Sequence, residues 1–220
     1  MTGPDDATDR PAADARVLRE HVESYLPEDD VLIAARAGAN HLGCTPVGPG
    51  GGAGLRFLAA AISAKAVVEI GTGAGVSGLW LLRGMVPAGV LTSIDVDPEH
   101  QRIARMAFTA AGHGPSRLRL INGMGLDVLP RLTDGGYDLV FIDAEPVDYP
   151  RYLDEAVRLL RPGGIVALDD ILSEGILDPD AAEPRVAALR EVARQVRADD
   201  RLVPVLLPLG DGLLAAVKIG

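Results

Sequence analysis

The stretch "EIGTGAGVSGLWLL", residues 69–82, runs from a short apolar strand into a glycine-rich turn and then into a helix. Gly71, Gly73 and Gly75 leave the turn without Cβ atoms, so its backbone can approach a bound ligand closely. In an open parallel sheet, ligands bind beyond the carboxyl ends of the strands, which is where this turn would lie. The stretch therefore predicts an α/β fold with a ligand site after this strand.

Two kinds of cofactor fit this layout, the dinucleotides and S-adenosylmethionine. Residues 73–78 spell GxGxxG, and Asp95 follows about 20 residues later, as a dinucleotide site would require. Glu69 separates the two, because its carboxylate would repel the pyrophosphate of NAD but attract the ammonium and sulfonium of S-adenosylmethionine. We expect Asp95 to accept hydrogen bonds from the ribose hydroxyls, and Asp97 to cap the next helix.

Apolar segments alternate with helical stretches along the rest of the chain. The first five predict parallel strands buried on both faces, and they are "AVVEIG", "GVLTSIDVD", "SRLRLING", "YDLVFIDA" and "GGIVALDD". The last two, "LVPVLLPL" and "LLAAVKI", flank a "GDG" turn and should pair antiparallel. Together they predict a doubly wound, mostly parallel α/β sheet with an antiparallel edge.

The N-terminal part has a different pattern. Residues 1–15 are rich in Asp, Ala and Pro without periodicity, which predicts a disordered tail. Apolar spacing over residues 15–42, interrupted at Pro27, predicts two short helices within a cap of residues 16–45. A glycine-proline loop then leads into a helix that ends near Ser63, and residues 46–220 are expected to form a single domain.

Charge and composition exclude several classes of function. The chain of 220 residues has 21 Lys and Arg against 31 Asp and Glu, and the basic residues are scattered, which argues against nucleic acid or anionic membranes as partners. No apolar run reaches the roughly 18 residues that span a bilayer, and the first residues are not signal-like, so we expect a cytoplasmic protein. Cys44 is expected to be a structural residue. The four histidines lack ligand spacing and are expected to be surface or structural residues; they are His21, His41, His100 and His113.

Four segments in order resemble the class I S-adenosylmethionine-dependent O-methyltransferases, within the family that includes the catechol and caffeoyl-coenzyme A enzymes. These are "EIGTGAGVSGLWL", "TSIDVDPEHQRIAR", "YDLVFIDAEPVDYPRYLDEAVRLLRPGGIVALDD" and "ALREVARQVRADDRLVPVLLPLGDGLLAAVK". The resemblance covers about residues 31–220. It implies a seven-stranded sheet with the last strand inserted antiparallel, and a homodimer.

The resemblance also implies a cofactor site, with Glu69 and the backbone of the glycine turn at the methionine end. Ser77 would hold the methionine carboxylate, because helix N-termini hold anions. Gly125 stands where the family usually has alanine against adenine, and Val47 would close over the cofactor. The full predicted set is Val47, Glu69, Gly71, Thr72, Gly73, Gly75, Ser77, Asp95, Gly125 and Asp143.

Three acids end two of the predicted strands: Asp143 follows "YDLVFI", and Asp169 with Asp170 follows "GGIVAL". If those strands are neighbours, the carboxylates converge, and a divalent cation would relieve their repulsion. In the resembling family these positions bind Mg²⁺ or a similar ion such as Mn²⁺ or Ca²⁺, which makes Asp143 the predicted catalytic residue. Alternatively, Asp143 orients only the methionine amine, and one acid of the pair caps a helix.

Besides Gly125, the chain departs from the family pattern at three positions. Pro146 replaces the lysine that is the usual candidate general base, Asp170 replaces an asparagine, and Ser173 replaces a tryptophan. Other candidate bases nearby are Glu145, Asp148 and Tyr149. The polar segment of residues 172–184 is a candidate substrate lid.

The sequence thus predicts an S-adenosylmethionine-dependent O-methyltransferase that acts on a small hydroxylated, catechol-like metabolite with the help of a divalent cation. A metal-independent methyltransferase of the same fold, with another acceptor, stays open because of Pro146. From a different class, a catalytically inactive cofactor-binding scaffold dimer also fits. A NAD-dependent oxidoreductase comes last because of Glu69.

Overall fold

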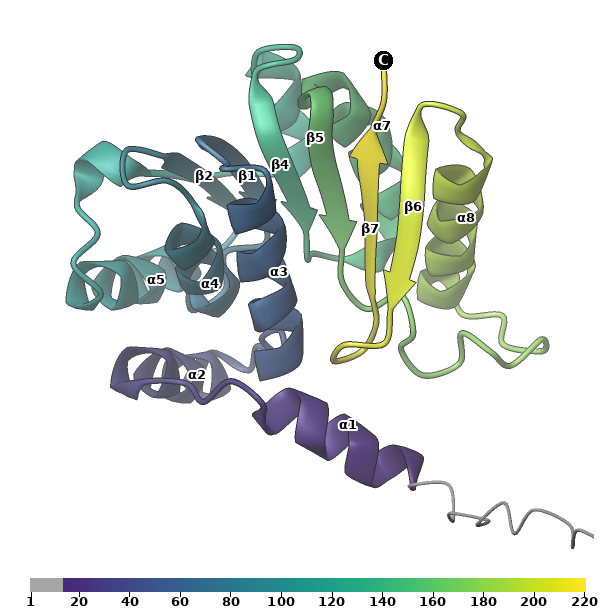
Figure 1. The fold of residues 1–220 in the computed structure, drawn as a ribbon, viewed down its shortest axis with the longest axis horizontal. Coiled ribbons are helices and arrows are strands. Elements are labelled where there is room, and N and C mark those ends of the chain that lie inside the picture. The colour runs from purple at the N-terminus through teal and green to yellow at the C-terminus, as the bar shows by residue number, and fades with distance from the viewer. Residues whose placement is uncertain (1–13) are drawn as a thin grey trace, which may run out of the picture.

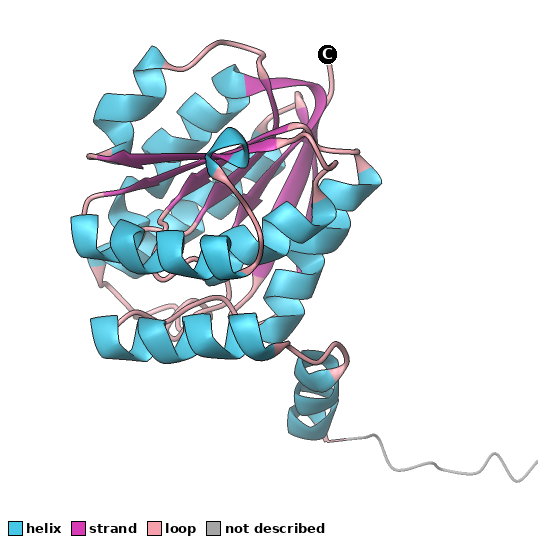
Figure 2. Cartoon of the chain, turned by 90° about the vertical axis from the view of Figure 1, so that its left-hand side faces the viewer, coloured by secondary structure: helices cyan, strands magenta, loops and turns pink. Residues whose placement is uncertain are grey.

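The computed structural model describes residues 14–220, which form one seven-stranded sheet with helices on both faces (Figures 1 and 2). The sheet has the order β3-β2-β1-β4-β5-β7-β6. The strands are β1 (Ala66–Ile70), β2 (Val90–Asp95), β3 (Leu118–Asn122), β4 (Tyr137–Ile142), β5 (Leu160–Leu168), β6 (Leu202–Leu207) and β7 (Leu213–Lys218). Strands β1 to β5 pair in parallel, and β7 lies antiparallel between β5 and β6. The predicted fold is confirmed, including the inserted last strand.

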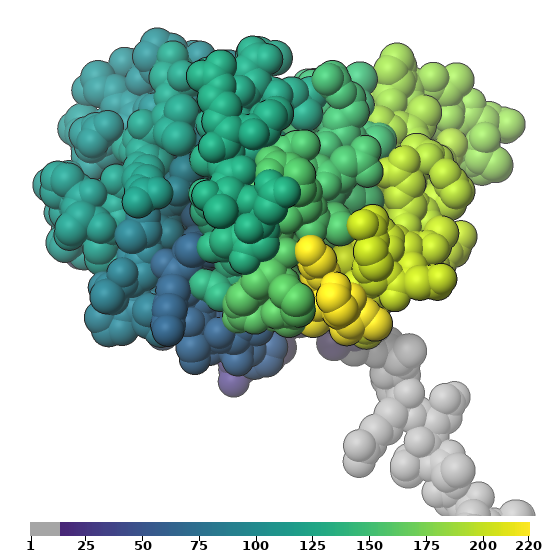
Figure 3. All heavy atoms as spheres, turned by 90° about the horizontal axis from the view of Figure 1, so that it is seen from above, coloured from purple at the N-terminus to yellow at the C-terminus, as the bar shows by residue number. Residues whose placement is uncertain are grey.

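The helices are α1 (Ala15–Ser24), α2 (Asp30–Leu42), α3 (Pro49–Ala61), α4 (Val76–Gly84), α5 (Pro98–Ala110), α6 (Gly125–Val128), α7 (Tyr149–Leu159) and α8 (Pro184–Ala198). One apolar core joins α3, α4 and α5 to a face of the sheet, and a second joins α7 and α8 to the opposite face. The buried face of α8 carries the predicted apolar stripe, namely Val186, Leu189, Val192 and Val196. Seen from above, the β6–β7 pair forms one flank of the molecule, far from α5 (Figure 3).

Strand β3 differs from the expected burial because β3 and β6 form the two edges of the sheet. Strand β3 has no buried residue, although its sequence predicted a strand covered on both faces. The central residues of β6 are exposed in the same way. An apolar run marks a strand, but its rank in the sheet depends on partners far along the chain.

The two predicted N-terminal helices are present as α1 and α2, and the chain breaks between them around Pro27. The side chain of Asp29 caps α2 by accepting a hydrogen bond from the amide of Leu32 at 3.1 Å. The predicted tail lies outside the described residues except for Asp14, which caps α1, and Ala15, which begins it. Among residues 14–220, no helix has both the length and the apolar character that crossing a bilayer requires.

The order of the strands determines where a ligand can bind. The chain moves outward from β1 to β2 and β3 and then returns to the other side of β1 as β4. In such sheets the crevice beyond the carboxyl ends of the strands, at this point of reversal, receives the ligand. The glycine turn after β1 and the acids after β2 and β4 all lie at that edge.

Candidate active site

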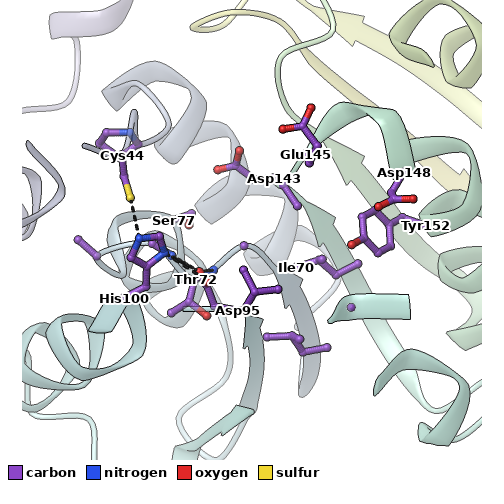
Figure 4. A pocket seen from close by; sticks show the side chains of 18 of the residues that line it. Cys44, Ile70, Thr72, Ser77, Asp95, His100, Asp143, Glu145, Asp148 and Tyr152 are labelled. Atoms are coloured by element: carbon purple, nitrogen blue, oxygen red, sulfur yellow. Dashed lines mark hydrogen bonds and ion pairs between the residues drawn. The ribbon is translucent and has the colours of Figure 1, made fainter. Parts of the chain in front are cut away.

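A cavity of about 370 Å³ opens at the carboxyl ends of β1, β2 and β4 (Figure 4). Seven of the ten predicted cofactor residues line this cavity: Gly71, Thr72, Gly73, Ser77, Asp95, Gly125 and Asp143. They come from three strand ends and from the starts of α4 and α6. The structure therefore brings together most of the residues that the sequence assigned to the cofactor.

The end of β1 at Ile70 and Gly71 is bonded to both neighbouring strands. Its amide donates to the carbonyl of Ile94 at 2.9 Å, and the amide of Asp143 donates to the carbonyl of Ile70 at the same distance. Gly71 has a φ of +99°, and a Cβ at this position would lie 1.7 Å from the carbonyl oxygen of Asp143. Only glycine fits here, because a side chain would have to occupy the space of the neighbouring backbone.

Asp95 anchors the glycine turn. Its carboxylate accepts hydrogen bonds from the amides of Thr72 and Gly73, each at 2.9 Å, and from the amide of Asp97 at 2.9 Å. Asp95 is nearly buried but lines the cavity, so one carboxylate both holds the turn and faces the ligand space. Asp97 caps α5, as predicted, because its side chain accepts a hydrogen bond from the amide of Glu99 at 2.8 Å.

Glu69 lies behind the cavity wall rather than in it. Its side chain is fully buried, and its two oxygens accept hydrogen bonds from Ser77 Oγ at 2.7 Å and Ser93 Oγ at 2.5 Å. Burial raises the pKa of Glu69 to about 7, although both serine hydrogen bonds favour the charged form. Glu69 thus orients Ser77, which is the residue of the pair that lines the cavity.

We expect the stability of the ligand-free protein to fall as the pH rises from about 4.5 to 7. The folded protein keeps a proton on Glu69 that the unfolded chain releases near 4.5, so this stabilisation is complete below that pH and lost through the folded pKa of about 7. The contribution is on the order of 3 kcal/mol. Glu69→Gln should flatten the pH dependence of thermal unfolding. An unchanged slope, equal to that of the exposed-site control Glu20→Gln, would contradict this.

Val47 does not line the cavity. Its side chain is buried in the apolar core, and its carbonyl accepts a hydrogen bond from Arg36 Nη2 at 2.7 Å. The preceding residues Thr45 and Pro46 line the cavity instead. The loop therefore approaches the site as predicted, but through other side chains.

Two predicted glycines have packing roles. Gly75 begins α4 with a φ of +88°, and a Cβ there would lie 3.1 Å from Ala104 and Phe108, so it permits close packing of α4 on α5. Gly125 lines the cavity, and a Cβ there would lie 2.7 Å from the ring of Tyr152. Alanine, the usual residue of the resembling family, would therefore displace Tyr152, which itself lines the cavity.

Asp143 and Asp169 end neighbouring strands, as expected. Ile142 of β4 pairs with Leu168 of β5, and the amide of Asp169 donates to the carbonyl of Ile142 at 3.1 Å. Burial, together with the charges of the neighbouring acids, raises the pKa of Asp143 well above its ordinary value. Burial also raises the pKa of Asp169 to about 7. The two strand ends thus bring together two acids whose charged forms are disfavoured by burial and by the neighbouring carboxylates.

Asp170 has a basic neighbour as well as the other two acids nearby. It has a φ of +65°, its Oδ2 lies 3.8 Å from Arg185 Nη2, and it lines a second cavity. Burial raises its pKa, and Arg185 partly offsets this effect. Within the part of the chain that the structure describes, no three His, Cys, Asp or Glu side chains are arranged as a ready metal-binding group.

The second cavity, of about 1200 Å³, lies on the side of Asp170 and shares Thr45 with the first. Its wall includes much of the predicted lid, residues 172–184, which contains turns and no strand and reaches the first residue of α8 at Pro184. Arg190 of α8 holds this segment by donating to the carbonyls of Gly175, Ile176 and Ala181 at 3.0 to 3.1 Å. Closure of the segment over a substrate stays a prediction.

The region of the missing lysine offers no strong base. Pro146 is buried at the start of a short 3₁₀ turn. Glu145 and Asp148 line the cavity, whereas Tyr149 is fully buried and does not line it, and its hydroxyl has no hydrogen-bond partner within residues 14–220. Burial and the nearby acids raise the pKa of Tyr149 well above its ordinary value, so it keeps its proton.

His100 and Cys44 line the cavity, which the sequence did not suggest. His100 Nδ1 lies 3.2 Å from both carboxylate oxygens of Asp95, and its Nε2 lies 3.3 Å from Cys44 Sγ. One signal was present: His100 falls on the first turn of α5, directly after the strand that ends at Asp95. His21 and His41 are exposed, as expected.

Comparison with known proteins identifies the family of this chain. The family model described as O-methyltransferase matches residues 30–219. This chain belongs to the O-methyltransferase family. This chain is 53% identical over 219 residues to a protein from Mycobacterium sp. (strain KMS) that is named as an O-methyltransferase. The match covers 99% of this chain and 100% of the relative.

Two solved structures resemble this methyltransferase closely. A Corynebacterium glutamicum protein has a TM-score of 0.86 at 34% identity, over 93% of this chain and 97% of that one. The O-methyltransferase TomG from Streptomyces achromogenes, involved in tomaymycin synthesis and crystallised with S-adenosylmethionine, has a TM-score of 0.83 at 28% identity, over 93% and 96%. The methyltransferase is thus an S-adenosylmethionine-dependent enzyme by family.

Proposed function

We propose that this methyltransferase moves a methyl group from S-adenosylmethionine to a hydroxyl of a small, catechol-like aromatic metabolite. The observation that carries this proposal is Asp95, held by the amides of the glycine turn with its carboxylate facing the 370 Å³ cavity. The cofactor occupies that cavity. The acceptor enters from the adjoining second cavity, which shares Thr45 with the first.

Different residues of the first cavity bind different parts of the cofactor. Asp95 accepts hydrogen bonds from the ribose, and Ser77 at the start of α4 faces the methionine carboxylate, where helix amides also favour an anion. Asp143 accepts from the methionine ammonium. Held at both ends, the sulfonium is kept near the acceptor hydroxyl, and such positioning supplies a large part of the rate enhancement of group transfer.

We also propose that a divalent cation, Mg²⁺ or a similar ion such as Mn²⁺ or Ca²⁺, binds among Asp143, Asp169 and Asp170. Carboxylate oxygens are the donors such ions prefer, and the raised pKa values reflect charge that a cation would neutralise. Asp170 must first turn from Arg185 toward the other two. A bound cation lowers the pKa of a coordinated hydroxyl, which would offset the absence of a base at Pro146.

Pro146 also supports a second candidate function, a metal-independent methyltransferase with another acceptor. The acids of β4 and β5 would then serve only the methionine ammonium and the local structure. A cofactor-binding scaffold without turnover is the third candidate. A cytoplasmic location stays a prediction from the sequence.

Calorimetry with S-adenosylhomocysteine and with NADH tests the cofactor assignment. We expect binding of the first ligand and none of the second, because the cavity joins Asp95 and Ser77 but its lining residues include no Lys or Arg that would bind a pyrophosphate. Methyl transfer to a panel of catechols then separates an enzyme from a scaffold. Preference for NADH would overturn all three candidate functions.

We propose that a second copy of the chain covers an apolar groove between α1, α3 and β6, which makes the protein a homodimer. The groove has a volume of about 510 Å³, and its lining includes Tyr25, which is 74% exposed, and Phe57, which is 71% exposed. The edge strand β6 adds further exposed apolar side chains, among them Val205. A contiguous apolar face of this kind supports an interface rather than a free surface.

Phe57→Lys combined with Val205→Lys should convert the dimer to a monomer in sedimentation velocity, because each lysine would bury a charge at the interface. Met106→Lys on α5 is a matched control, since Met106 is 59% exposed but lies outside the groove. A wild-type protein that sediments as a monomer at micromolar concentration would contradict the proposal.

A further inference from the structure

Cys44, His100 and Asp95 form a connected chain on the wall of the first cavity, and the proposed function uses only Asp95 of the three. Cys44 follows α2, His100 lies in the first turn of α5, and Asp95 ends β2. The distances are 3.3 Å from Cys44 Sγ to His100 Nε2 and 3.2 Å from His100 Nδ1 to each Asp95 oxygen. Figure 4 shows the ring of His100 between the other two side chains.

The carboxylate of Asp95 has little accepting capacity left. It already accepts from the amides of Thr72, Gly73 and Asp97, and a carboxylate offers about four lone-pair sites. The remaining lone pairs of both oxygens face Nδ1 of His100, which lies 3.2 Å from each. A ribose hydroxyl that donates to Asp95 must therefore enter where the imidazole now contacts the carboxylate, with its own oxygen facing the ring.

The surroundings of the ring determine which nitrogen carries the proton. Nδ1 faces Asp95, which can only accept, so Nδ1 carries hydrogen and donates. Nε2 faces the thiol of Cys44 at 3.3 Å, and Asp97 Oδ2 lies farther from it, at 3.8 Å. Burial, together with the charges of Asp95, Asp97 and Asp143, raises the pKa of Cys44, so the thiol keeps its proton and donates it to Nε2. The same shift argues against Cys44 as a nucleophile.

We propose that His100 is a further cofactor-binding residue, which donates its Nδ1–H to the ribose hydroxyl whose hydrogen Asp95 accepts, while the ring keeps its contact with Cys44. The hydroxyl is then satisfied both as donor and as acceptor. His100 returns to Asp95 when the cofactor leaves. This inference rests on the proposed binding of S-adenosylmethionine in the first cavity.

The test is calorimetry of S-adenosylhomocysteine and of its 2′-deoxy and 3′-deoxy analogues with four variants. We expect His100→Ala to weaken binding of the parent ligand by about 5- to 10-fold, the worth of one neutral hydrogen bond. His100→Asn should restore most of the affinity, because its amide can occupy the position of Nδ1–H. Cys44→Ala should cost less than His100→Ala. His41→Ala, at an exposed histidine of α2, should bind as the wild type does.

The deoxy analogues distinguish a ribose contact from a general structural role. Against the analogue that lacks the contacted hydroxyl, His100→Ala and the wild type should bind equally. Equal losses for all three ligands, or no loss for any, would overturn the inference. A wild-type protein that does not bind S-adenosylhomocysteine would instead refute the proposed function, so the two failures can be told apart.

Discussion

Gly71→Ala is expected to lower the free energy of unfolding by about 2–5 kcal/mol and to abolish detectable binding of S-adenosylhomocysteine. The left-handed φ of +99° accounts for part of this loss. The rest comes from the clash of the new Cβ with the carbonyl of Asp143, which would lie 1.7 Å away. Relief of the clash requires β1 and β4 to separate at the point where the cofactor cavity begins. Urea unfolding and calorimetry measure the two effects.

Gly112→Ala is a matched control for the backbone contribution. Gly112 also has a left-handed φ, +80°, but a Cβ there would meet nothing within 4 Å. Its cost should be the conformational part alone, about 1–2 kcal/mol, with ligand binding intact. If both variants unfolded at the same urea concentration, the proposed clash between the new Cβ at position 71 and the carbonyl of Asp143 would be wrong.

Asp169→Asn should have opposite effects on activity and on stability. Without the carboxylate, cation binding and turnover are expected to fall by at least about 100-fold. Removing a residue that only hydrogen-bonds a metal ligand usually costs about 10- to 100-fold, and loss of a ligand itself should cost more. The metal-free protein should nevertheless melt at a higher temperature at pH 8, because a neutral amide replaces a buried acid whose pKa burial and Asp170 raise to about 7. Manganese calorimetry, turnover and thermal unfolding measure these effects.

Asp178→Asn is the control for a general change in charge, because Asp178 is an exposed acid of the second cavity. It should leave cation binding and melting temperature near the wild-type values. Full turnover of Asp169→Asn, or wild-type turnover that persists in EDTA, would favour the metal-independent candidate instead. Loss of turnover without loss of manganese binding would mean that Asp169 acts on the methionine ammonium and is not a cation ligand.

The arrangement of the acids could be predicted from the sequence because it depends on local order along the chain. Asp143 and Asp169 each follow an apolar strand, and successive parallel strands commonly lie side by side. The contact of Glu69 could not be predicted in the same way. Its partner Ser93 belongs to β2, and only the register of β1 against β2 brings the two together.

The same limit explains what the sequence could not show about two further residues. Gly125 was assigned to the adenine, but its small size also accommodates Tyr152 from α7, which lies in another layer of the fold. His100 lacked a ligand-like spacing to any other histidine, so it was expected to be structural. Its position became informative only once the end of β2 and the start of α5 were placed around the same cavity.

The anchoring of residues 175–181 by Arg190 has a consequence for how this enzyme could diversify. The guanidinium binds backbone carbonyls and therefore reads no side-chain identity in the segment that it holds. Side chains facing the second cavity can then change by mutation while the path of the chain is preserved. New acceptor preferences could evolve by substitution along this segment, provided that position 190 stays arginine.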